Sequence, residues 1–254
     1  MISKNQIKYI KSLEQKKVRY REGMFVAEGP KVVGDLLEAG YVPDRIMATP
    51  EWFQNGNWQE EGCSQIVTDE ELNRISFLQH PQQVLAVFPI PVFQNQNHDF
   101  SSHLFLALDN VQDPGNLGTI IRIADWFGIT TIFCSPDTAD AYNPKVVQAT
   151  MGSIARVHVV YTDLQMLFSE IPAGTPVYGT FLDGKDIYEQ TLSPNGIIIM
   201  GNEGNGISHE VAKYVNKKLL IPHYPAEKET ADSLNVAIAT AITCAEFRRR
   251  KTSL

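Results

Sequence analysis

The sequence predicts an α/β protein whose larger, C-terminal part is a mostly parallel sheet with helices on both faces. From residue 104 onward, short apolar runs alternate with helical segments, which is the pattern of parallel strands joined by helices. Two of these segments begin with a polar residue before a proline, Asp113-Pro114 and Asn143-Pro144, which is typical of a helix N-terminus. The β-branched run at 197–200 is short and bounded by glycine, so it fits a fully buried parallel strand.

The composition indicates a globular chain. Of the 254 residues, 43% are hydrophobic and 20% are charged, which excludes a disordered chain. We find no apolar run of membrane-spanning length and no signal-peptide pattern at the first residues. Cys63, Cys134 and Cys244 form no C-x-x-C pair, so neither a zinc site nor a disulfide framework is indicated. We expect a reduced, cytoplasmic setting and no metal.

The net charge of −7 is unevenly distributed along the chain. Residues 1–21 carry seven lysines and arginines against one acid, and the tail at 248–251 is entirely basic. Basic helices of this kind are often simply exposed to solvent and bind no partner. Two basic clusters on an acidic body also suit a polyanion that is held at defined places.

Residues 1–88 predict a small α/β domain. Helices are expected over 4–20, 30–39 and about 69–77, and strands over 24–27, 45–48, 65–67 and 84–88. The first helix is indicated by the apolar stripe of Ile7, Ile10 and Leu13, and the third by Asp69 as its cap.

Residues 89–103 contain two prolines and no clear periodicity, which predicts an interdomain linker. The second domain is expected over 104–254. Its strands are expected over 104–108, 131–134, 157–161, 177–181, 197–200 and 219–221. In such sheets, ligands bind at the carboxyl ends of the strands.

The strand at 197–200 leads into a glycine-rich turn with one acid, Glu203. Gly201, Gly204 and Gly206 have no Cβ, so the backbone can approach a ligand closely there, and Ser208 is placed to cap the next helix. Similar turns occur away from any site, so a structural turn and a ligand loop both remain open. The spacing matches neither the dinucleotide fingerprint nor the phosphate loop, so neither NAD nor ATP is indicated.

Two further segments carry polar residues near strand ends. Asn116 lies near a helix start, where polar ligands are met. Arg122 lies among isoleucines on the same helix and either pairs with a core acid or contacts a phosphate or ribose. After the last strand, Ser233 is placed to cap a helix, and Asn235 would then lie in its first turn.

Together these segments resemble the three motifs of the SpoU (TrmH-type) RNA 2′-O-ribose methyltransferases of the SPOUT class. The motifs are NVQDPGNLGTIIRIADWFG (110–128), MGNEGNGIS (200–208) and IPHYPAEKETADSLNVAIA (221–239). The N-terminal part, with REGMFVAEGPKVV (21–33), looks like the small substrate-binding domain of many members. The resemblance implies methyl transfer from S-adenosylmethionine to a ribose 2′-hydroxyl of RNA. It also implies a homodimer and a C-terminal trefoil knot, which the general rule against threaded chains would not predict.

The resemblance implies which residues act. The catalytic positions are Arg122, Asn116, Glu203, Ser233 and Asn235. The cofactor-binding positions are Thr180, Phe181, Leu182, Met200, Gly201, Asn202, Gly204, Ile221, Pro222, Ser233 and Leu234. Most of these contacts would come from the backbone, which favours small residues. The loop at 223–232 is longer, glycine-free and more acidic than is usual in the family, where it borders the cofactor pocket.

The resemblance leaves Arg122 open as base or positioner. A guanidinium stays protonated in nearly any protein setting, so we expect Arg122 to align the 2′-oxygen with the methyl group. Glu203 would hold the glycine loop or receive a proton through water. Asn116 and Asn235 would orient Arg122 and the substrate.

The N-terminal domain is expected to bind the RNA. Its candidate phosphate contacts are Lys4, Lys8, Lys11, Lys16, Lys17, Arg19 and Arg21. Trp52, Phe53 and Trp58 either stack on bases or pack a local core. Ribosomal RNA, 23S in particular, is favoured over transfer RNA because a separate domain of this kind is commoner among such members. A non-catalytic RNA-binding protein is the alternative, and the sequence leaves open whether the domain serves its own or the partner's site.

Overall fold

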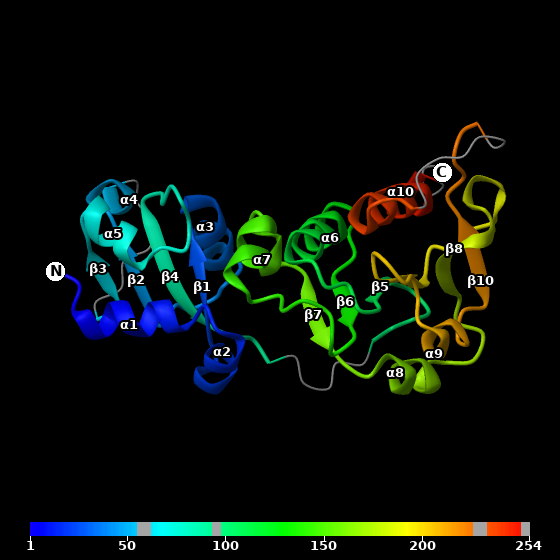
Figure 1. Cartoon of the computed structure of the whole chain (residues 1–254), viewed down its shortest axis with the longest axis horizontal. Coiled ribbons are helices and arrows are strands. Elements are labelled where there is room, and N and C mark those ends of the chain that lie inside the picture. The colour runs from blue at the N-terminus through cyan, green and yellow to red at the C-terminus, as the bar shows by residue number, and fades with distance from the viewer. Residues whose placement is uncertain (55–61, 93–97, 226–232, 250–254) are drawn as a thin grey trace. The chain divides into compact units, whose positions relative to one another are not determined.

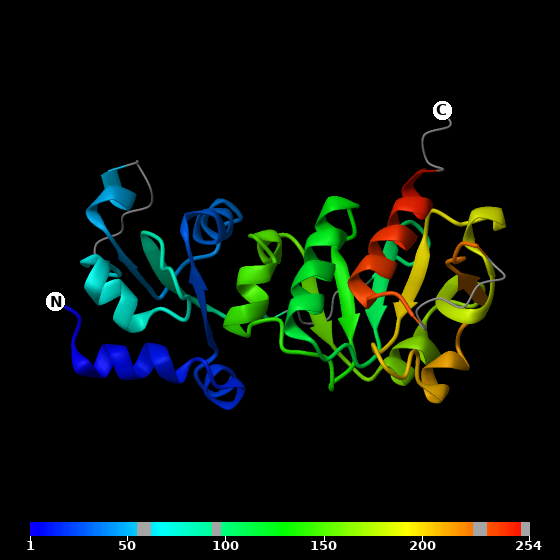
Figure 2. The same cartoon turned by 45° about the horizontal axis from the view of Figure 1, so that its top comes forward.

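The computed structural model describes residues 1–54, 62–92, 98–225 and 233–249. The chain divides into two compact units. Unit 1 comprises Met1–Val92 and Asp140–Arg156, and unit 2 comprises Phe93–Ala139 and Val157–Leu254. Each unit is a layered arrangement of helices on a sheet (Figures 1 and 2). Among the described residues, no helix is both long and apolar enough to cross a membrane.

Unit 1 is built on a four-stranded sheet with the order β1-β4-β2-β3. Its strands are β1 (Met24–Glu28), β2 (Arg45–Ala48), β3 (Ser64–Ile66) and β4 (Val84–Pro89), and its first helices are α1 (Lys4–Ser12), α2 (Lys16–Glu22), α3 (Pro30–Glu38), α4 (Pro50–Gln54) and α5 (Asp69–Ile75). The central strand β4 runs antiparallel to both β1 and β2. One core cluster joins α1 and α5 to the sheet through Ile10, Leu72 and Leu85.

Two helix boundaries differ from the prediction. The helix expected over 4–20 is two helices, because the chain leaves the helical conformation after Leu13 and Gln15 takes an extended one with φ −84° and ψ 125°. The cap of α5 is Thr68 and not Asp69, since the Thr68 hydroxyl accepts from the Glu71 N–H in a capping box.

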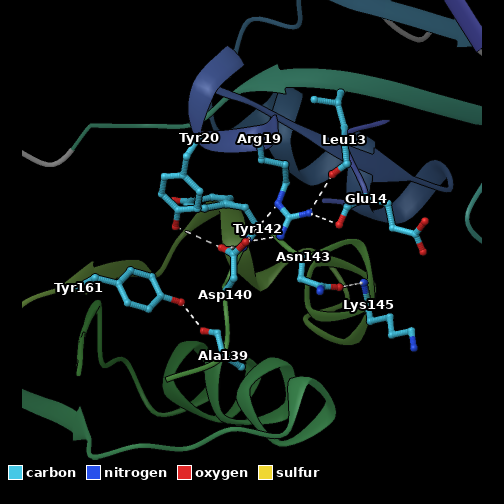
Figure 3. Close-up of polar contacts among 10 residues, drawn as sticks. All are labelled: Leu13, Glu14, Arg19, Tyr20, Ala139, Asp140, Tyr142, Asn143, Lys145 and Tyr161. Carbon is cyan, nitrogen blue, oxygen red and sulfur yellow. Dashed lines mark hydrogen bonds and ion pairs between the residues drawn. The ribbon is translucent and has the colours of Figure 1, made fainter. Parts of the chain in front are cut away.

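The segment Asp140–Arg156 belongs to unit 1, although the sequence grouped it with the rest of 104–254. It contains α7 (Pro144–Ala149), which packs on β1, and the 3₁₀ turn η1 (Ser153–Ala155), which packs on α3. A buried ion pair joins it to α2, where Arg19 donates to Asp140 from Nε at 3.1 Å and also from Nη2 (Figure 3). At its other end, Arg156 Nη1 lies 2.9 Å from the Asp35 carboxylate of α3.

Unit 2 confirms the predicted parallel sheet with helices on both faces. Its strands are β5 (Leu104–Leu108), β6 (Thr131–Cys134), β7 (His158–Tyr161), β8 (Val177–Asp186), β9 (Gly196–Met200) and β10 (Lys217–Leu220). They lie in the order β10-β8-β9-β5-β6-β7, and each neighbouring pair is parallel. The central strands β5 and β9 are buried along their whole length, as expected for a parallel sheet covered on both sides.

The helices of unit 2 form two layers. They are α6 (Pro114–Trp126) and α10 (Val236–Arg249) on one side, and α8 (Leu164–Glu170) and α9 (His209–Ala212) on the other, with a 3₁₀ turn η2 (Ile187–Glu189) after β8. Leu164, Phe168 and Val211 pack beneath the sheet in one core cluster. On the other face α6 and α10 lie side by side in both views (Figures 1 and 2).

Candidate functional site

A cavity of about 610 Å³ lies in unit 2, where β9 ends and β8 leaves its pairing with β9. Its walls are Thr180, Phe181, Leu182, Asp183, Met200, Gly201, Asn202, Glu203, Gly204, Asn205, Gly206, Ile207, Leu220, Ile221, Ser233, Leu234, Val236 and Ala239. The structure therefore brings all the expected cofactor-binding residues except Pro222 around one cavity. Its size is that of a small-molecule site, for which about 300–1,000 Å³ is usual.

The sequence analysis missed six of the wall residues, Asp183, Asn205, Ile207, Leu220, Val236 and Ala239. Three of them directly adjoin expected cofactor-binding residues, since Asp183 follows Leu182, Asn205 follows Gly204 and Leu220 precedes Ile221. Extending each expected segment by one residue would have found these three. Val236 and Ala239 are on α10 and required the three-dimensional fold.

Asn202 holds the glycine-rich loop in shape. Its backbone pairs with Gly206 through two hydrogen bonds of 2.9 Å. Its side-chain oxygen accepts from the N–H groups of Gly204 at 2.9 Å and Asn205 at 3.0 Å, and its side-chain nitrogen donates to the Asn110 carbonyl at 2.8 Å. One amide side chain therefore closes the loop and fastens it to the end of β5.

Two of the three loop glycines are required by the protein itself. A Cβ on Gly201 would lie 2.1 Å from the carbonyl carbon of Gly206, so no side chain fits. Gly206 has φ +68°, which glycine adopts without strain. A Cβ on Gly204 would find only an ordinary contact, 3.6 Å from the Asn202 side-chain oxygen. The loop geometry therefore leaves Gly204 replaceable, unlike Gly201.

Three residues from the three motifs form a chain of side-chain hydrogen bonds. Asn116 Nδ2 donates to Glu203 Oε1 at 2.9 Å, and Asn235 Nδ2 donates to Asn116 Oδ1 at 2.9 Å. A carboxylate only accepts, so Glu203 fixes which way the Asn116 amide faces, and Asn116 in turn fixes Asn235. Side chains from the three motifs therefore lie together, with Glu203 at the cavity wall.

Helix starts position two members of this chain. Asp113 caps α6 and accepts from the Asn116 backbone N–H at 2.8 Å. Asn235 caps α10, since its side-chain oxygen accepts from the N–H groups of Ala237 and Ile238. Ser233 was expected to be this cap, and that expectation is wrong because α10 begins three residues later; Ser233 is an exposed wall residue of the cavity.

Arg122 lies on the exposed side of α6. Within the described ranges it makes no hydrogen bond or ion pair, so pairing with a core acid is excluded there. At 100° per residue, six residues turn Arg122 about 120° away from Asn116 on the helix, and it is not a cavity wall residue. The structure therefore brings Asn116, Glu203 and Asn235 together and leaves Arg122 on an open face.

An ion pair shapes the rim of the cavity. Lys218 Nζ lies 2.8 Å from the Asp183 carboxylate, and this hydrogen bond lowers the pKa of Asp183 below its ordinary value. The same ammonium group lies 4.7 Å from the ring centre of Phe181, a cation–π contact that favours one position of this wall residue. Asp183 therefore stays negatively charged at the rim near neutral pH.

The expected RNA-binding residues have different environments in unit 1. Lys4, Lys8, Lys16, Lys17 and Arg21 are exposed on α1 and α2. Lys11 is half-buried and donates to the Ser76 carbonyl. Arg19 is 1% exposed and holds Asp140, so its assignment to RNA is wrong: the guanidinium is enclosed by its own fold.

The expected aromatic platform is also absent from the described part of α4. Trp52 and Phe53 are buried and contact each other edge to face, which is the local-core alternative. Trp58 lies outside the described residues, as do positions 226–232 of the atypical loop and the last two basic residues of the tail, Arg250 and Lys251.

The described residues contain no group of three or more His, Cys, Asp or Glu side chains that could hold a metal ion. The site therefore offers amide, carboxylate and backbone groups around an open cavity.

Comparisons with known proteins agree with both units. Residues 103–245 match the SpoU rRNA Methylase family, and residues 4–86 match the MRM3-like substrate binding domain. The Bacillus subtilis (strain 168) 23S rRNA (guanosine(2553)-2′-O)-methyltransferase RlmP is 32% identical over 97% of this chain and 97% of its own length.

Two solved structures resemble the whole chain. One, from Porphyromonas gingivalis and assigned to the TrmH family, is 41% identical with a TM-score of 0.87, over 98% of this chain and 99% of that one. The other is the AdoMet-bound rRNA methyltransferase from Sinorhizobium meliloti, 31% identical with a TM-score of 0.88, over 100% of this chain and 98% of that one.

Proposed function

The chain belongs to the SpoU rRNA methylase family, and from this we propose its reaction. We propose that it transfers a methyl group from S-adenosylmethionine to the 2′-hydroxyl of a ribose in RNA, with 23S ribosomal RNA as the substrate. The observation that carries this proposal is the chain Asn235–Asn116–Glu203, which ends at the wall of a cavity of about 610 Å³.

The cavity fits S-adenosylmethionine. Gly201 lies so close to Gly206 that the loop turns without side chains, which leaves backbone groups facing a ligand. Phe181 and Leu234 offer apolar surface in the same wall, and Asp183 offers a negative charge for a cationic ligand. The cofactor supplies an electrophilic methyl group on a sulfonium. In this proposal it is held by the wall residues and Pro222, and the surrounding chain forms the trefoil knot of the family.

Glu203 is proposed to receive the proton of the ribose hydroxyl. Its Oε1 is occupied by Asn116; Oε2 has no hydrogen-bond partner among the described residues and is left to accept a proton directly or through water. Asn235 holds Asn116 and thereby the carboxylate orientation. The chain of amides therefore acts by positioning the acceptor.

Arg122 is proposed to hold the RNA in line for transfer. Its guanidinium is exposed and carries five N–H donors and no acceptor, so it suits a phosphate or ribose oxygen better than the role of a base. Asn116 is too far around the helix to orient it. The group that completes the site beside Arg122 is therefore the RNA or another subunit.

A homodimer is proposed to form through α6 and α10. These helices run parallel, because Asn235 bonds Asn116 at their starts and Arg248 bonds the Phe127 carbonyl at their ends. Their outer faces expose Trp126, 85% accessible, and Ile238, 52% accessible. Exposed large apolar side chains on adjacent helices are typical of an interface, and Arg122 lies on the same helix as Trp126.

Introducing a negative charge on the outer face of α6 and α10 tests the proposed dimer interface. We expect Trp126→Glu to weaken self-association about 30-fold, since tryptophans at interface centres contribute about 2 kcal/mol or more. Met166→Glu is the matched control, because Met166 is 62% exposed on α8, which covers the other face of the sheet. Sedimentation equilibrium measures both. A monomeric wild-type protein at micromolar concentration, or equal effects of the two variants, would contradict the proposed interface.

The choice of RNA is tested by labelled methyl transfer. Total RNA from a strain that lacks this gene is incubated with the protein and methyl-labelled S-adenosylmethionine, then separated by size. We expect label in the large ribosomal RNA, in line with the MRM3-like domain at 4–86 and the B. subtilis relative. Label in the small fraction would move the substrate to transfer RNA. Cofactor binding without label in any fraction would favour the non-catalytic alternative.

A further inference from the structure

Among the described residues of unit 1, Tyr20 is an exposed aromatic residue on the basic helix α2. It lies on α2, is 47% accessible, and follows directly after the buried Arg19. Trp52 and Phe53, two of the three residues expected to stack on bases, are inside the core, and Trp58 lies outside the described residues. Tyr20 is therefore a further candidate for the stacking role of unit 1.

The positive side chains of α2 lie on the same side as this ring. At 100° per residue, Lys16, Lys17, Tyr20 and Arg21 fall within an arc of about 140°, and all four are exposed. Lys16 Nζ lies 5.9 Å from the ring centre of Tyr20. Glu22 forms an exposed ion pair with Arg21 at 2.8 Å, and that contact is weak in water. One cation therefore contacts the ring, and two more lie on the same side of the helix.

Buried polar groups hold the hydroxyl end of the Tyr20 ring in place. Tyr20 Oη donates to Asp140 Oδ1 at 3.2 Å, and the same oxygen accepts from the Tyr142 N–H at 3.1 Å (Figure 3). The other oxygen of Asp140 accepts from Arg19 Nε at 3.1 Å. Arg19 Nη1 donates to the carbonyls of Leu13 at 2.8 Å and Glu14 at 2.6 Å, which fixes the turn before α2.

This anchoring lowers the entropy that binding would cost. A tyrosine has two rotatable side-chain bonds, and a fixed hydroxyl leaves little freedom to lose when a partner covers the ring. The hydroxyl is held from the inner side, so an exposed part of the ring remains available as an apolar surface. A fixed exposed ring flanked by cations matches the surface that binds single-stranded nucleic acid, where bases stack and phosphates meet lysines.

We propose that Tyr20 is a base-stacking platform for a single-stranded segment of the RNA substrate, with Lys16, Lys17 and Arg21 contacting the flanking phosphates. The inference rests on the proposed function for the identity of the ligand as RNA. It assigns a new role to Asp140 and Arg19, which position the platform and do not touch RNA. In this proposal the segment 16–21 binds RNA in two ways: its basic side chains contact phosphates, and the fixed ring of Tyr20 stacks on a base.

Binding of short oligoribonucleotides to the full chain tests the platform. The probes are a single-stranded oligouridylate and an abasic oligomer of the same length. We expect Tyr20→Ala to weaken binding of the oligouridylate about tenfold, since stacking on an aromatic ring is lost, and to leave the abasic oligomer unaffected. Tyr20→Phe keeps the ring and loses only the bond to Asp140, so its loss is smaller. Tyr188→Ala in unit 2 is the matched control, because Tyr188 is 48% exposed.

Two results would overturn the platform. One is equal binding of oligouridylate by Tyr20→Ala and Tyr188→Ala, and the other is an equal loss for the abasic oligomer, which would reduce the effect to charge or folding. Thermal unfolding of each variant checks that unit 1 is intact. A face that binds protein instead of RNA would give the first of these results.

Methyl transfer separates this inference from the proposed function. With labelled substrate RNA, we expect Tyr20→Ala to raise KM and leave kcat unchanged, because stacking outside the site contributes equally to ground and transition states. Wild-type protein that binds the oligomer through Tyr20 but methylates no RNA would refute the proposed function and keep the platform. Normal methylation with an unchanged KM for Tyr20→Ala would refute the platform alone.

Discussion

The residues of the site divide into those held by the fold and one that is not. Glu203, Asn116 and Asn235 are linked by hydrogen bonds of 2.9 Å. Arg122 is exposed on α6 and has no polar partner within the described ranges. A charged side chain that the fold leaves without a partner is free to take its partner from the substrate, which is the role proposed for it.

Replacing Arg122 separates positioning from cofactor binding. We expect Arg122→Ala to lower the turnover number about 100-fold, since misplacing a reacting atom by about 1 Å is enough for such a loss. Affinity for S-adenosylmethionine, measured by calorimetry, is expected to stay unchanged because Arg122 is not a wall residue of the cavity.

Two further variants sharpen this prediction. Arg122→Lys is expected to remain impaired, because an ammonium cannot present two parallel donors to an oxyanion. Lys213→Ala, which also removes an exposed cation from unit 2, is the control and is expected to be fully active. Near-normal turnover of Arg122→Ala would remove Arg122 from the mechanism.

The environments of some single residues could not be predicted from the sequence. Arg19 looked like every other cation of a basic segment, and only the fold places Asp140 against it, 121 positions along the chain. Ser233 and Asn235 are both good caps, and local preference does not choose between them. The contact of Asn235 with Asn116 on another helix settles that choice in the structure.

At the scale of elements, the strand that ends in the glycine-rich loop is the part most strongly specified by local sequence. The run at 197–200 was predicted as a buried parallel strand, and β9 is buried from Gly196 to Met200. Strands β5, β6 and β9 were placed within one residue of their observed bounds, because short apolar runs that end at turns or helix caps leave few alternatives. β8 extends five residues beyond the predicted end, to Asp186, because it gains β10 as a partner there.

The glycine-rich loop gives a prediction with an internal control. We expect Gly201→Ala to destabilise unit 2 by about 1–3 kcal/mol, because its Cβ would overlap the backbone at Gly206. Gly204→Ala is expected to be neutral, since its Cβ makes only an ordinary contact at 3.6 Å. Denaturant unfolding of the two variants measures the difference. Equal midpoints would show that the loop relaxes around an added methyl group and that its shape is not fixed by Gly201.

At the scale of the whole molecule, the chain combines a sheet of parallel strands that carries the cavity with a smaller unit that carries the basic helices. Hydrophobic periodicity predicted the smaller part, and the alternation of strands and helices predicted the larger one. They did not predict that residues 140–156, which lie within the second part of the sequence, pack in unit 1. This packing depends on contacts between residues more than a hundred positions apart, such as Arg156 with Asp35. No local sequence pattern contains such information.

The central claim is that the cavity and its hydrogen-bonded carboxylate serve methylation of a ribose hydroxyl. The measurement that tests it most directly is alkaline hydrolysis of 23S ribosomal RNA labelled by the wild-type protein. A methylated 2′-oxygen cannot attack the neighbouring phosphate, so the account predicts one uncleaved bond on the 3′ side of the labelled nucleotide. Labelled RNA that alkali cleaves at every position would place the methyl group on a base and contradict the account.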